Sequence, residues 1–354
     1  MSRQSKVALA AILGALVGLG TLVGVVYALR DSDPESEAAP PATTDLVETG
    51  ETGEVVPTEE EPAELTRTIE VGGFPNAVAV GQQSVWVVRD GRRLLRIDPD
   101  TGTIEAQIGA GDELGSERPC GVAVDENAAW VTTVSGNVAR INTRANRLGR
   151  LIPVSGAACV ATGAGGVWVT SPDLDTVTRI DPATNTIVAQ ISVDGFPQGI
   201  DVGFGGVWVA AADPPEGANG AVYRIDPQTN EIVAAIPLDG LPEFVAVGAG
   251  GVWATASDGT VRLIEPGSNQ VVEPPAQVSE GGRTSVTVGG GMVWATTLTG
   301  PDAVGSAVQI DPETAEVVGP PISVGENPIG LAFGAGSLWV ANSSDGTLTS
   351  YTPG

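Results

Sequence analysis

The sequence of 354 residues predicts an all-β fold, a seven-bladed β-propeller with four-stranded blades. All seven tryptophans lie in versions of one phrase, such as "GGVWVA" around Trp208, and they recur every 38 to 45 residues. A period near 40 residues is typical of repeat architectures. Each repeat contains four short runs of β-forming residues separated by turn residues, and no stretch after Leu65 has the period of a helix. The sequence therefore indicates seven copies of one four-stranded unit.

The first strand of each repeat is apolar throughout, as in "NAVAV" from Asn76 and "FVAVG" from Phe244, which is typical of a strand with both faces buried. The glycines before each tryptophan predict a tight turn into the second strand. The tryptophan then predicts a large packing block between neighbouring blades, the alternative being a ring of stacking platforms for a ligand. A "DP" pair after the third strand predicts the next turn, at Asp98-Pro99, Asp181-Pro182, Asp226-Pro227 and Asp311-Pro312.

The last repeat lacks its fourth strand, since it starts near Gly325 and ends at "SYTPG" after three. The missing strand is expected from the other end of the propeller, where "LTRTIEVGG" at Leu65–Gly73 matches the fourth strands of the other repeats. Such a strand would close the ring and remove an exposed sheet edge. The predicted propeller spans residues 65–354.

The first 64 residues have a different composition. Val7–Leu29 is a run of 23 uncharged, largely apolar residues, and as a helix it would be about 34 Å long, enough to span a bilayer. Two bases precede the run and acids follow it, which predicts a cytoplasmic tail at 1–6 and an extracytoplasmic remainder. We therefore expect a single-pass anchor in the cell membrane; a cleaved signal peptide ending near Ala28 is the alternative.

Residues 30–64 form the predicted acidic linker. Asp31–Glu64 carries 12 acids and no bases, and it is rich in Pro, Thr and Ser, which is typical of an extended, disordered segment. The linker contributes 12 of the formal net charge of −26, so the rest of the chain is acidic as well. This charge argues against a nucleic-acid partner and against an anionic lipid surface.

The two cysteines occupy comparable places in consecutive repeats. Cys120 and Cys159 begin the innermost strands of blades two and three, ten and nine residues before Trp130 and Trp168. They are expected at the same end of adjacent strands, where a disulfide is chemically allowed outside the cytoplasm. The sequence leaves open whether they are bridged or are two small buried residues.

The repeat "PxxVAVGxGGVWVA" followed by "TVxRIDPxTxxIVAxI" resembles that of the bacterial streptogramin lyases (virginiamycin B lyase-like) and of YncE-like propellers. "CGVAVDENAAWVTTVSGNVARI" at Cys120–Ile141 is similar to an NHL repeat. The resemblance covers Leu65–Gly354 and implies a propeller fold. It also implies that a lyase of this lineage would use a histidine with an acidic partner, but this chain contains no histidine to take that role.

Other catalytic patterns are also absent from the sequence. It has no Ser–His or Cys–His pair, no EF-hand loop, no Walker loop and no cysteine–histidine metal motif. We therefore expect no cofactor and no metal, and a binding protein rather than an enzyme.

Differences in loop length indicate where binding would occur. Strand direction alternates, so the fourth-to-first and second-to-third connections lie on one side of the propeller, which we call the loop face; the other connections lie on the turn face. On the turn face the turns are short and uniform, whereas the enlarged connections Gly109–Pro119, Ala211–Gly220 and Thr297–Ser306 belong to the loop face. Variable loops on a rigid scaffold are common binding sites, although drift in exposed hairpins has the same appearance.

Two groups of residues on this face are candidate ligand contacts. One is the basic loop "RDGRR", which could hold a carboxylate or a phosphate through Arg89, Asp90, Arg92 and Arg93. The other lines the mouth of the central channel, where residues ten positions before a tryptophan differ from blade to blade: Asn76, Gln198, Glu243 and Thr284, with Arg283 beside the last.

The sequence thus predicts a membrane-anchored propeller that binds a small molecule, a glycan or a protein through its loop face. Two alternatives remain. One is an enzyme of streptogramin-lyase-like lineage that acts on a small extracellular molecule, and the other is a structural component of the cell envelope.

Overall fold

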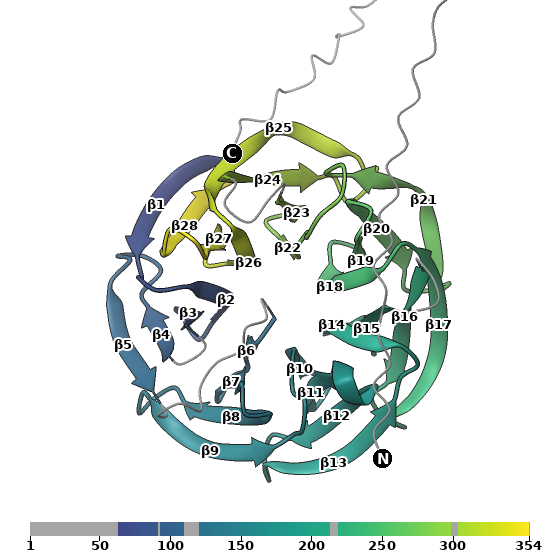
Figure 1. The fold of residues 1–354 in the computed structure, drawn as a ribbon, viewed down its shortest axis with the longest axis horizontal. Helices are drawn as coiled ribbons and strands as arrows, with labels where there is room; N and C mark the ends of the chain where they lie inside the picture. Colours follow the sequence, from purple (N-terminus) through teal and green to yellow (C-terminus); the bar gives the residue numbers. More distant parts are fainter. Residues whose placement is uncertain (1–62, 91–92, 110–119, 213–218, 299–303, 354) are drawn as a thin grey trace, which may run out of the picture. The chain divides into compact units, whose positions relative to one another are not determined.

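The computed structural model describes residues 63–90, 93–109, 120–212, 219–298 and 304–353. These residues form seven four-stranded antiparallel sheets, arranged around a centre like the blades of a propeller (Figure 1). The predicted all-β, seven-bladed architecture is confirmed. Among the described residues no helix has the length and apolar character needed to cross a membrane, and the predicted span Val7–Leu29 lies outside them.

Each blade runs from an innermost strand beside the channel to an outermost strand at the rim (Figure 1). The strands of blades one to three are β2 (Pro75–Gly81), β3 (Ser84–Arg89), β4 (Arg93–Ile97) and β5 (Ile104–Gly109); β6 (Val122–Val124), β7 (Ala129–Thr132), β8 (Asn137–Asn142) and β9 (Arg147–Pro153); β10 (Val160–Gly163), β11 (Gly166–Ser171), β12 (Thr176–Asp181) and β13 (Thr186–Ser192). A short 3₁₀ turn, η1 (Pro172–Leu174), follows β11.

Blades four to six repeat this order. Their strands are β14 (Phe196–Gly203), β15 (Gly206–Ala212), β16 (Asn219–Asp226) and β17 (Glu231–Asp239); β18 (Pro242–Gly248), β19 (Gly251–Ala256), β20 (Thr260–Glu265) and β21 (Gln270–Gln277); β22 (Val286–Gly289), β23 (Met292–Thr297), β24 (Val304–Ile310) and β25 (Val317–Glu326).

Blade seven joins the two ends of the propeller. It consists of β26 (Pro328–Gly334), β27 (Ser337–Asn342), β28 (Thr347–Thr352) and, as its outermost strand, β1 (Glu64–Glu70). β1 pairs antiparallel with β28, with Ile69 opposite Leu348, and the backbone N–H of Val71 donates to the carbonyl of Gly346. The predicted closure of the ring by the first strand is therefore confirmed.

The tryptophans form the packing layer of the propeller. None of the seven is more than 1 % exposed. In six blades the indole Nε1–H donates to the carbonyl of the glycine five residues earlier, as from Trp208 to Gly203 at 3.0 Å. In blade two the donor Trp130 instead meets the carboxylate of Asp125 at 2.7 Å. Buried and hydrogen-bonded in this way, the rings are structural and offer no stacking surface to a ligand.

The glycine that accepts the indole proton also allows adjacent blades to approach closely. A Cβ atom on Gly81 of blade one would lie 2.8 Å from Cγ1 of Val124 of blade two. The same glycine-to-neighbour contact recurs at the equivalent glycine of the other five glycine-containing blades, and only blade two has a side chain here, that of Asp125.

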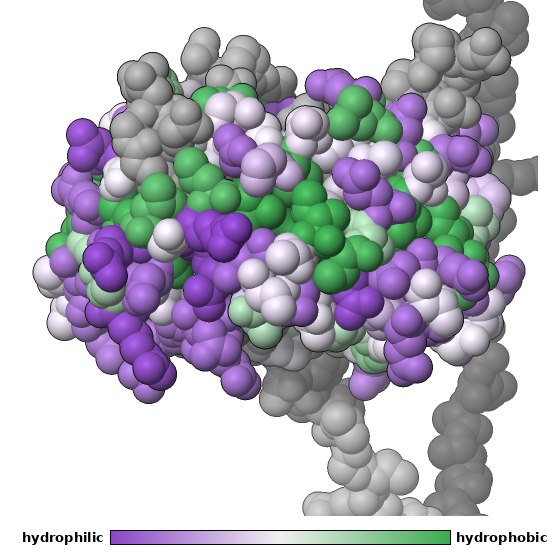
Figure 2. Space-filling model, turned by 90° about the horizontal axis from the view of Figure 1, so that it is seen from below, coloured by the Kyte–Doolittle hydropathy of each residue, from purple (hydrophilic) through white to green (hydrophobic). Residues whose placement is uncertain are grey.

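The outermost strands contribute little to the core. In β13 only Ile191 is buried, whereas Ile187 and Val188 are 41 % and 53 % exposed. Figure 2 shows the corresponding apolar band on the rim, between polar residues above and below it. The buried side chains concentrate in the inner three strands, which are the strands that position the channel and the two faces.

Candidate functional site

The central channel is narrow and apolar. One side chain per blade, eight positions before its tryptophan, lines a cavity of about 150 Å³: Val78, Val122, Val160, Ile200, Val245, Val286 and Leu331. Ser285 also lines this cavity, but its hydroxyl already donates to the Ile329 carbonyl, so the side chains described here are mainly aliphatic. A ligand that needs several hydrogen bonds would find more partners at either end of the channel or between blades.

At the loop-face mouth, the four predicted residues stand at the starts of their inner strands. Asn76 and Thr284 are buried, 8 % and 0 % exposed, whereas Gln198 and Glu243 are partly exposed. The mouth is tied together from blade to blade: the hydroxyl of Thr170 donates to the Gln198 carbonyl at 2.8 Å, and the hydroxyl of Ser285 donates to the Ile329 carbonyl at 2.8 Å. The backbone at the mouth is therefore rigid, and the side chains that it carries differ from blade to blade.

Glu243, Arg283 and Thr284 form one cluster across blades five and six. Burial raises the pKa of the Glu243 carboxyl, against the opposing effects of the Arg283 charge and the Thr284 backbone N–H. Glu243 Oε2 and Thr284 Oγ1 are both buried, and neither has a hydrogen-bond partner among the described residues. Buried polar atoms are nearly always paired, so this cluster has unused capacity for hydrogen bonds.

The basic loop of blade one is used largely for structure. Arg89 Nη1 donates to the Val71 carbonyl, and Arg89 Nε lies 3.4 Å from Asp90 Oδ2. Asp90 Oδ1 in turn accepts the backbone N–H of Phe74 at 2.7 Å. These contacts fasten the chain where it enters blade one, which leaves the exposed Arg93 as the basic side chain of the loop that remains available in the described residues. Arg92 lies outside them.

The enlarged loop-face connections fall mostly outside the described residues. Residues 110–119, 213–218 and 299–303 are the parts of the three predicted loops concerned. The flanking strands β5, β15 and β23 end at Gly109, Ala212 and Thr297, so the connections leave the propeller from the ends predicted for them.

Cys120 and Cys159 are joined by a disulfide at the mouth, with their Cα atoms 4.8 Å apart. The backbone supports the same junction, because the N–H of Val160 donates to the Cys120 carbonyl at 3.0 Å. The hydroxyl of Thr132 in blade two also donates to the Ala158 carbonyl at 2.8 Å, so blade three is attached to blade two at the loop face by one covalent bond and by hydrogen bonds.

Asp201 is a second buried carboxylate, near the turn-face end of β14. Five other blades place alanine at this position. Its two oxygens accept the backbone N–H of Val202 at 2.8 Å and of Val247 in blade five at 2.7 Å. Burial raises the pKa of Asp201 to about 6. Because each oxygen accepts a backbone N–H from a different blade, this buried carboxylate links blades four and five.

On the turn face, arginines clamp successive blades together. In blades one to four an arginine on the third strand lies over the tryptophan of its own blade, at 4.9 to 5.5 Å from the ring centroid. Three of these arginines continue into the next blade, where Nη1 donates to a backbone carbonyl and to the Oδ1 atom of an asparagine. The clamps are Arg96 to Thr143 and Asn146, Arg179 to Pro227 and Asn230, and Arg224 to Pro266 and Asn269.

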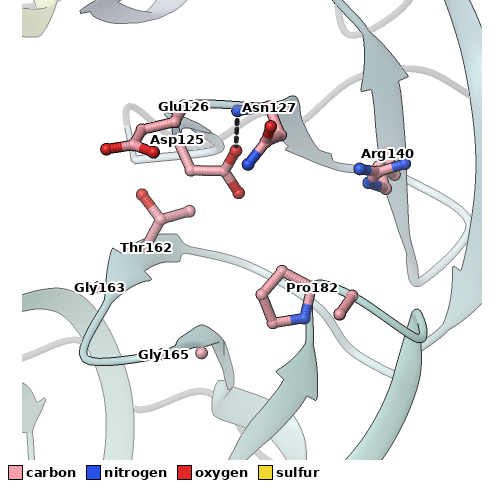
Figure 3. A pocket seen from close by; sticks show the side chains of 10 residues that line it. Asp125, Glu126, Asn127, Arg140, Thr162, Gly163, Gly165 and Pro182 are labelled. Atoms are coloured by element: carbon pink, nitrogen blue, oxygen red, sulfur yellow. Dashed lines mark hydrogen bonds between the residues drawn. The ribbon is translucent and has the colours of Figure 1, made fainter.

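The junction between blades two and three lacks this clamp. Arg140 lies over Trp130, but its guanidinium makes no hydrogen bond or ion pair with any described residue, and its Nε is buried without a partner. Asn185, which occupies the asparagine position in blade three, has a buried Oδ1 that is also without a partner in the described residues. A cavity of about 620 Å³ lies at this junction, lined by Arg140 on one side and Pro182 on the other (Figure 3).

This cavity was not predicted from the sequence. Blade two does differ from the others, since it has "DENAAW" where they have glycines, but Arg140 and Asn185 occupy the same positions as the residues of the neighbouring clamps. Asp125 Oδ1 holds the backbone N–H groups of Asn127 and Ala128 at 2.6 and 2.8 Å and so shapes the first-to-second turn (Figure 3). The described residues contain no group of three or more side chains suited to hold a metal ion.

Comparisons with known proteins support the fold. No family model and no curated protein matches the sequence. Among the solved structures, a streptogramin B lyase structure aligns with a TM-score of 0.64 at 16 % identity, over 80 % of this chain and 95 % of that chain. A structure of U3-55K aligns with a TM-score of 0.64 at 10 % identity, over 80 % of this chain and 98 % of that chain. This chain therefore has a streptogramin lyase-like propeller fold, and the low identities carry no activity across.

Proposed function

We propose that this chain is a membrane-anchored, extracytoplasmic binding propeller that recognises its ligand at the loop-face mouth of the channel. The observation that carries the proposal is the buried Oε2 of Glu243, which has no hydrogen-bond partner among the described residues. A ligand that donates a hydrogen bond there would satisfy a group whose unpaired burial is otherwise costly. Arg283 is exposed beside it and would add a donor from the protein.

This chemistry favours a ligand with several hydroxyl or amide groups. The mouth offers a carboxylate as acceptor and a guanidinium as donor, both close to a rigid backbone ring. Glycans and peptides both present donors and acceptors at short spacing. The narrow apolar channel below the mouth would support binding at the surface rather than within the propeller.

The proposed location rests on the first 64 residues and on the cysteines. Val7–Leu29 has the length and composition of a membrane span, with bases before it and acids after it. The disulfide between Cys120 and Cys159 supports an oxidising compartment for the propeller. The acidic segment Asp31–Glu64 would then hold the propeller away from the membrane surface.

The mouth can be tested by screening the full chain, purified in detergent, against soluble saccharides and short peptides for a rise in melting temperature. Hits should be lost in Glu243→Gln and kept in Glu231→Gln, a neutralisation of an exposed acid at the start of β17. A hit that survives Glu243→Gln would place recognition elsewhere. Chemical conversion of a hit would instead favour the enzyme, with Glu243 as its acid, and failure of every probe would favour a structural role.

The anchor has a separate test. Protease added to intact cells should release the propeller by cutting within Asp31–Glu64, while a chain lacking residues 1–29 should not fractionate with membranes. Propeller that stays protected from protease in intact cells would contradict the extracytoplasmic location.

A further inference from the structure

The cavity between blades two and three occupies the place where neighbouring junctions have an arginine clamp. We propose that it binds a small monocarboxylate that also carries a hydrogen-bond donor, namely an amino acid, a hydroxy acid or the C-terminus of a short peptide. This site lies on the turn face, so it is independent of the mouth proposed above.

Arg140 supplies the group that would hold the carboxylate. Its Cζ lies over the Trp130 ring, 5.5 Å from the ring centroid, so the indole supports the guanidinium through a cation–π contact. In the clamped blades the equivalent guanidinium donates to a backbone carbonyl and to an asparagine, as Arg179 Nη1 does at 2.6 and 2.9 Å. At Arg140 these donors have no acceptor among the described residues, and a carboxylate matches their paired geometry.

The cavity lining also supplies an acceptor, the carboxylate of Glu126. Asn185 does not line the cavity, although its buried Oδ1 also lacks a donor in the described residues. A ligand that only accepts hydrogen bonds would satisfy Arg140 and leave Glu126 unpaired. A ligand with an amino or hydroxyl group beside its carboxylate would satisfy both residues, which is why the proposal requires a donor.

Two acids in the cavity lining, Asp125 and Glu126, limit the negative charge that a ligand can carry. Asp125 lines the cavity and accepts hydrogen bonds on both carboxylate oxygens from residues of its own blade. Glu126 is exposed and has no hydrogen bond or ion pair with a described residue (Figure 3). Two anions and one cation disfavour a ligand with several negative charges, and they favour a positively charged amino group near Glu126.

The size of the cavity agrees with a small molecule. Its volume of about 620 Å³ lies within the range of roughly 300–1,000 Å³ that is usual for ligand sites. A second hollow of about 600 Å³ shares Asp125, Glu126, Thr162 and Gly163 with it and extends toward Gln82 of blade one. This continuity provides room for a residue beyond the carboxylate, as in a dipeptide.

The test is calorimetric titration of the full chain in detergent with glycine, L-lactate and glycylglycine, with glycinamide and sulfate as probes that lack one required group. We expect at least one of the first three to bind and both of the last two to fail. Glycine over lactate would indicate that Glu126 selects an amino group, and glycylglycine over glycine would indicate a peptide terminus.

Variants at two matched arginines separate binding from folding. Arg140→Gln and Glu126→Ala should each weaken binding at least about tenfold, because each removes a hydrogen bond to the ligand. Arg140→Lys should restore part of the affinity. Arg179→Gln, which opens the neighbouring clamp, should lower the melting temperature and leave the affinity within about twofold of the wild type.

Three results would overturn the proposal. One is that none of the three carboxylates binds at millimolar concentration. Another is that sulfate binds as well as they do, which would reveal an anion site that makes no use of the Glu126 acceptor. The third is that Arg140→Gln lowers the melting temperature as much as Arg179→Gln, which would mean that Arg140 clamps blade three in solution and that the cavity closes.

Discussion

Two neighbouring junctions, between blades two and three and between blades three and four, have an arginine and an asparagine at equivalent positions. They differ in which face of the propeller carries the contacts that join the two blades. At the second of these, Arg179 reaches Pro227 and Asn230 on the turn face. At the first, the turn face is open and the disulfide between Cys120 and Cys159 closes the loop face.

The difference teaches that a repeat protein can change one interface without losing its ring. A blade that lacks one clamp is still constrained by its neighbours and by its buried tryptophan. The covalent bond at the mouth offsets the contact that is missing below it. A cavity can therefore exist at this junction in a propeller that is otherwise tightly packed.

Opening the ring would remove the constraint on every junction, so it should have the largest effect. Deletion of Leu65–Gly72 removes the buried side chains of Ile69 and Val71 and exposes the edge of β28. We expect a loss of about 5 kcal/mol or more in the free energy of unfolding. Deletion of Asp31–Pro57 is the control. Equal melting temperatures for the two deletions would contradict closure by β1.

The tryptophan layer should be equally important on both sides of the comparison. Trp208→Ala and Trp130→Ala should each cost about 3–5 kcal/mol, the usual cost of truncating a fully buried large aromatic residue. Urea unfolding would measure this. A much smaller cost at Trp130 would show that the open junction has already relaxed around its ring.

The disulfide should matter because one face of its junction is open. It closes a loop of 39 residues, and Cys159→Ala should cost about 2–4 kcal/mol. Reductant should lower the melting temperature of the wild type and leave that of the variant unchanged. If reductant affects both proteins alike, the bridge is not what holds this junction.

Asp201 gives a pH-dependent probe of a third junction. Its folded-state pKa of about 6 exceeds the ordinary value of 3.8, so the folded state holds the proton more tightly. Its contribution to stability is therefore fully present below about pH 3.8 and is lost as the pH rises through 6, by at most about 3 kcal/mol at roughly 1.36 kcal/mol per unit.

Asp201→Ala should remove this pH dependence, which is best measured as the difference in unfolding free energy between wild type and variant from about pH 4 to pH 7. A constant difference across that range would show that Asp201 keeps an ordinary pKa between blades four and five.

The smallest expected effect is the most direct test of the comparison. Arg179→Ala breaks hydrogen bonds to Pro227 and Asn230 and should cost about 1–2 kcal/mol. Arg140→Ala breaks none with a described residue, and it should cost about 0.5–1 kcal/mol through lost stacking on Trp130. Equal costs would mean that the two junctions are alike in solution.

Sequence alone was enough for the architecture. Its 40-residue period, the placement of all seven tryptophans and the match of Leu65–Gly73 to the fourth strands predict seven closed blades, because packing of identical units depends on residues that recur. It also identified the mouth residues, since position ten before each tryptophan can be counted directly.

Tertiary structure decided the features that depend on contacts between different blades. The sequence shows Arg140 and Arg179 in equivalent positions, and only their surroundings show that one is paired across the junction and the other is not. In the same way, Arg89 belongs to a basic cluster in the sequence but is engaged by Val71 and Asp90 in the fold. Hydrogen bonds between residues about 45 positions apart depend on angles and distances that a repeat pattern does not encode, so the cavity at blades two and three becomes visible only in three dimensions.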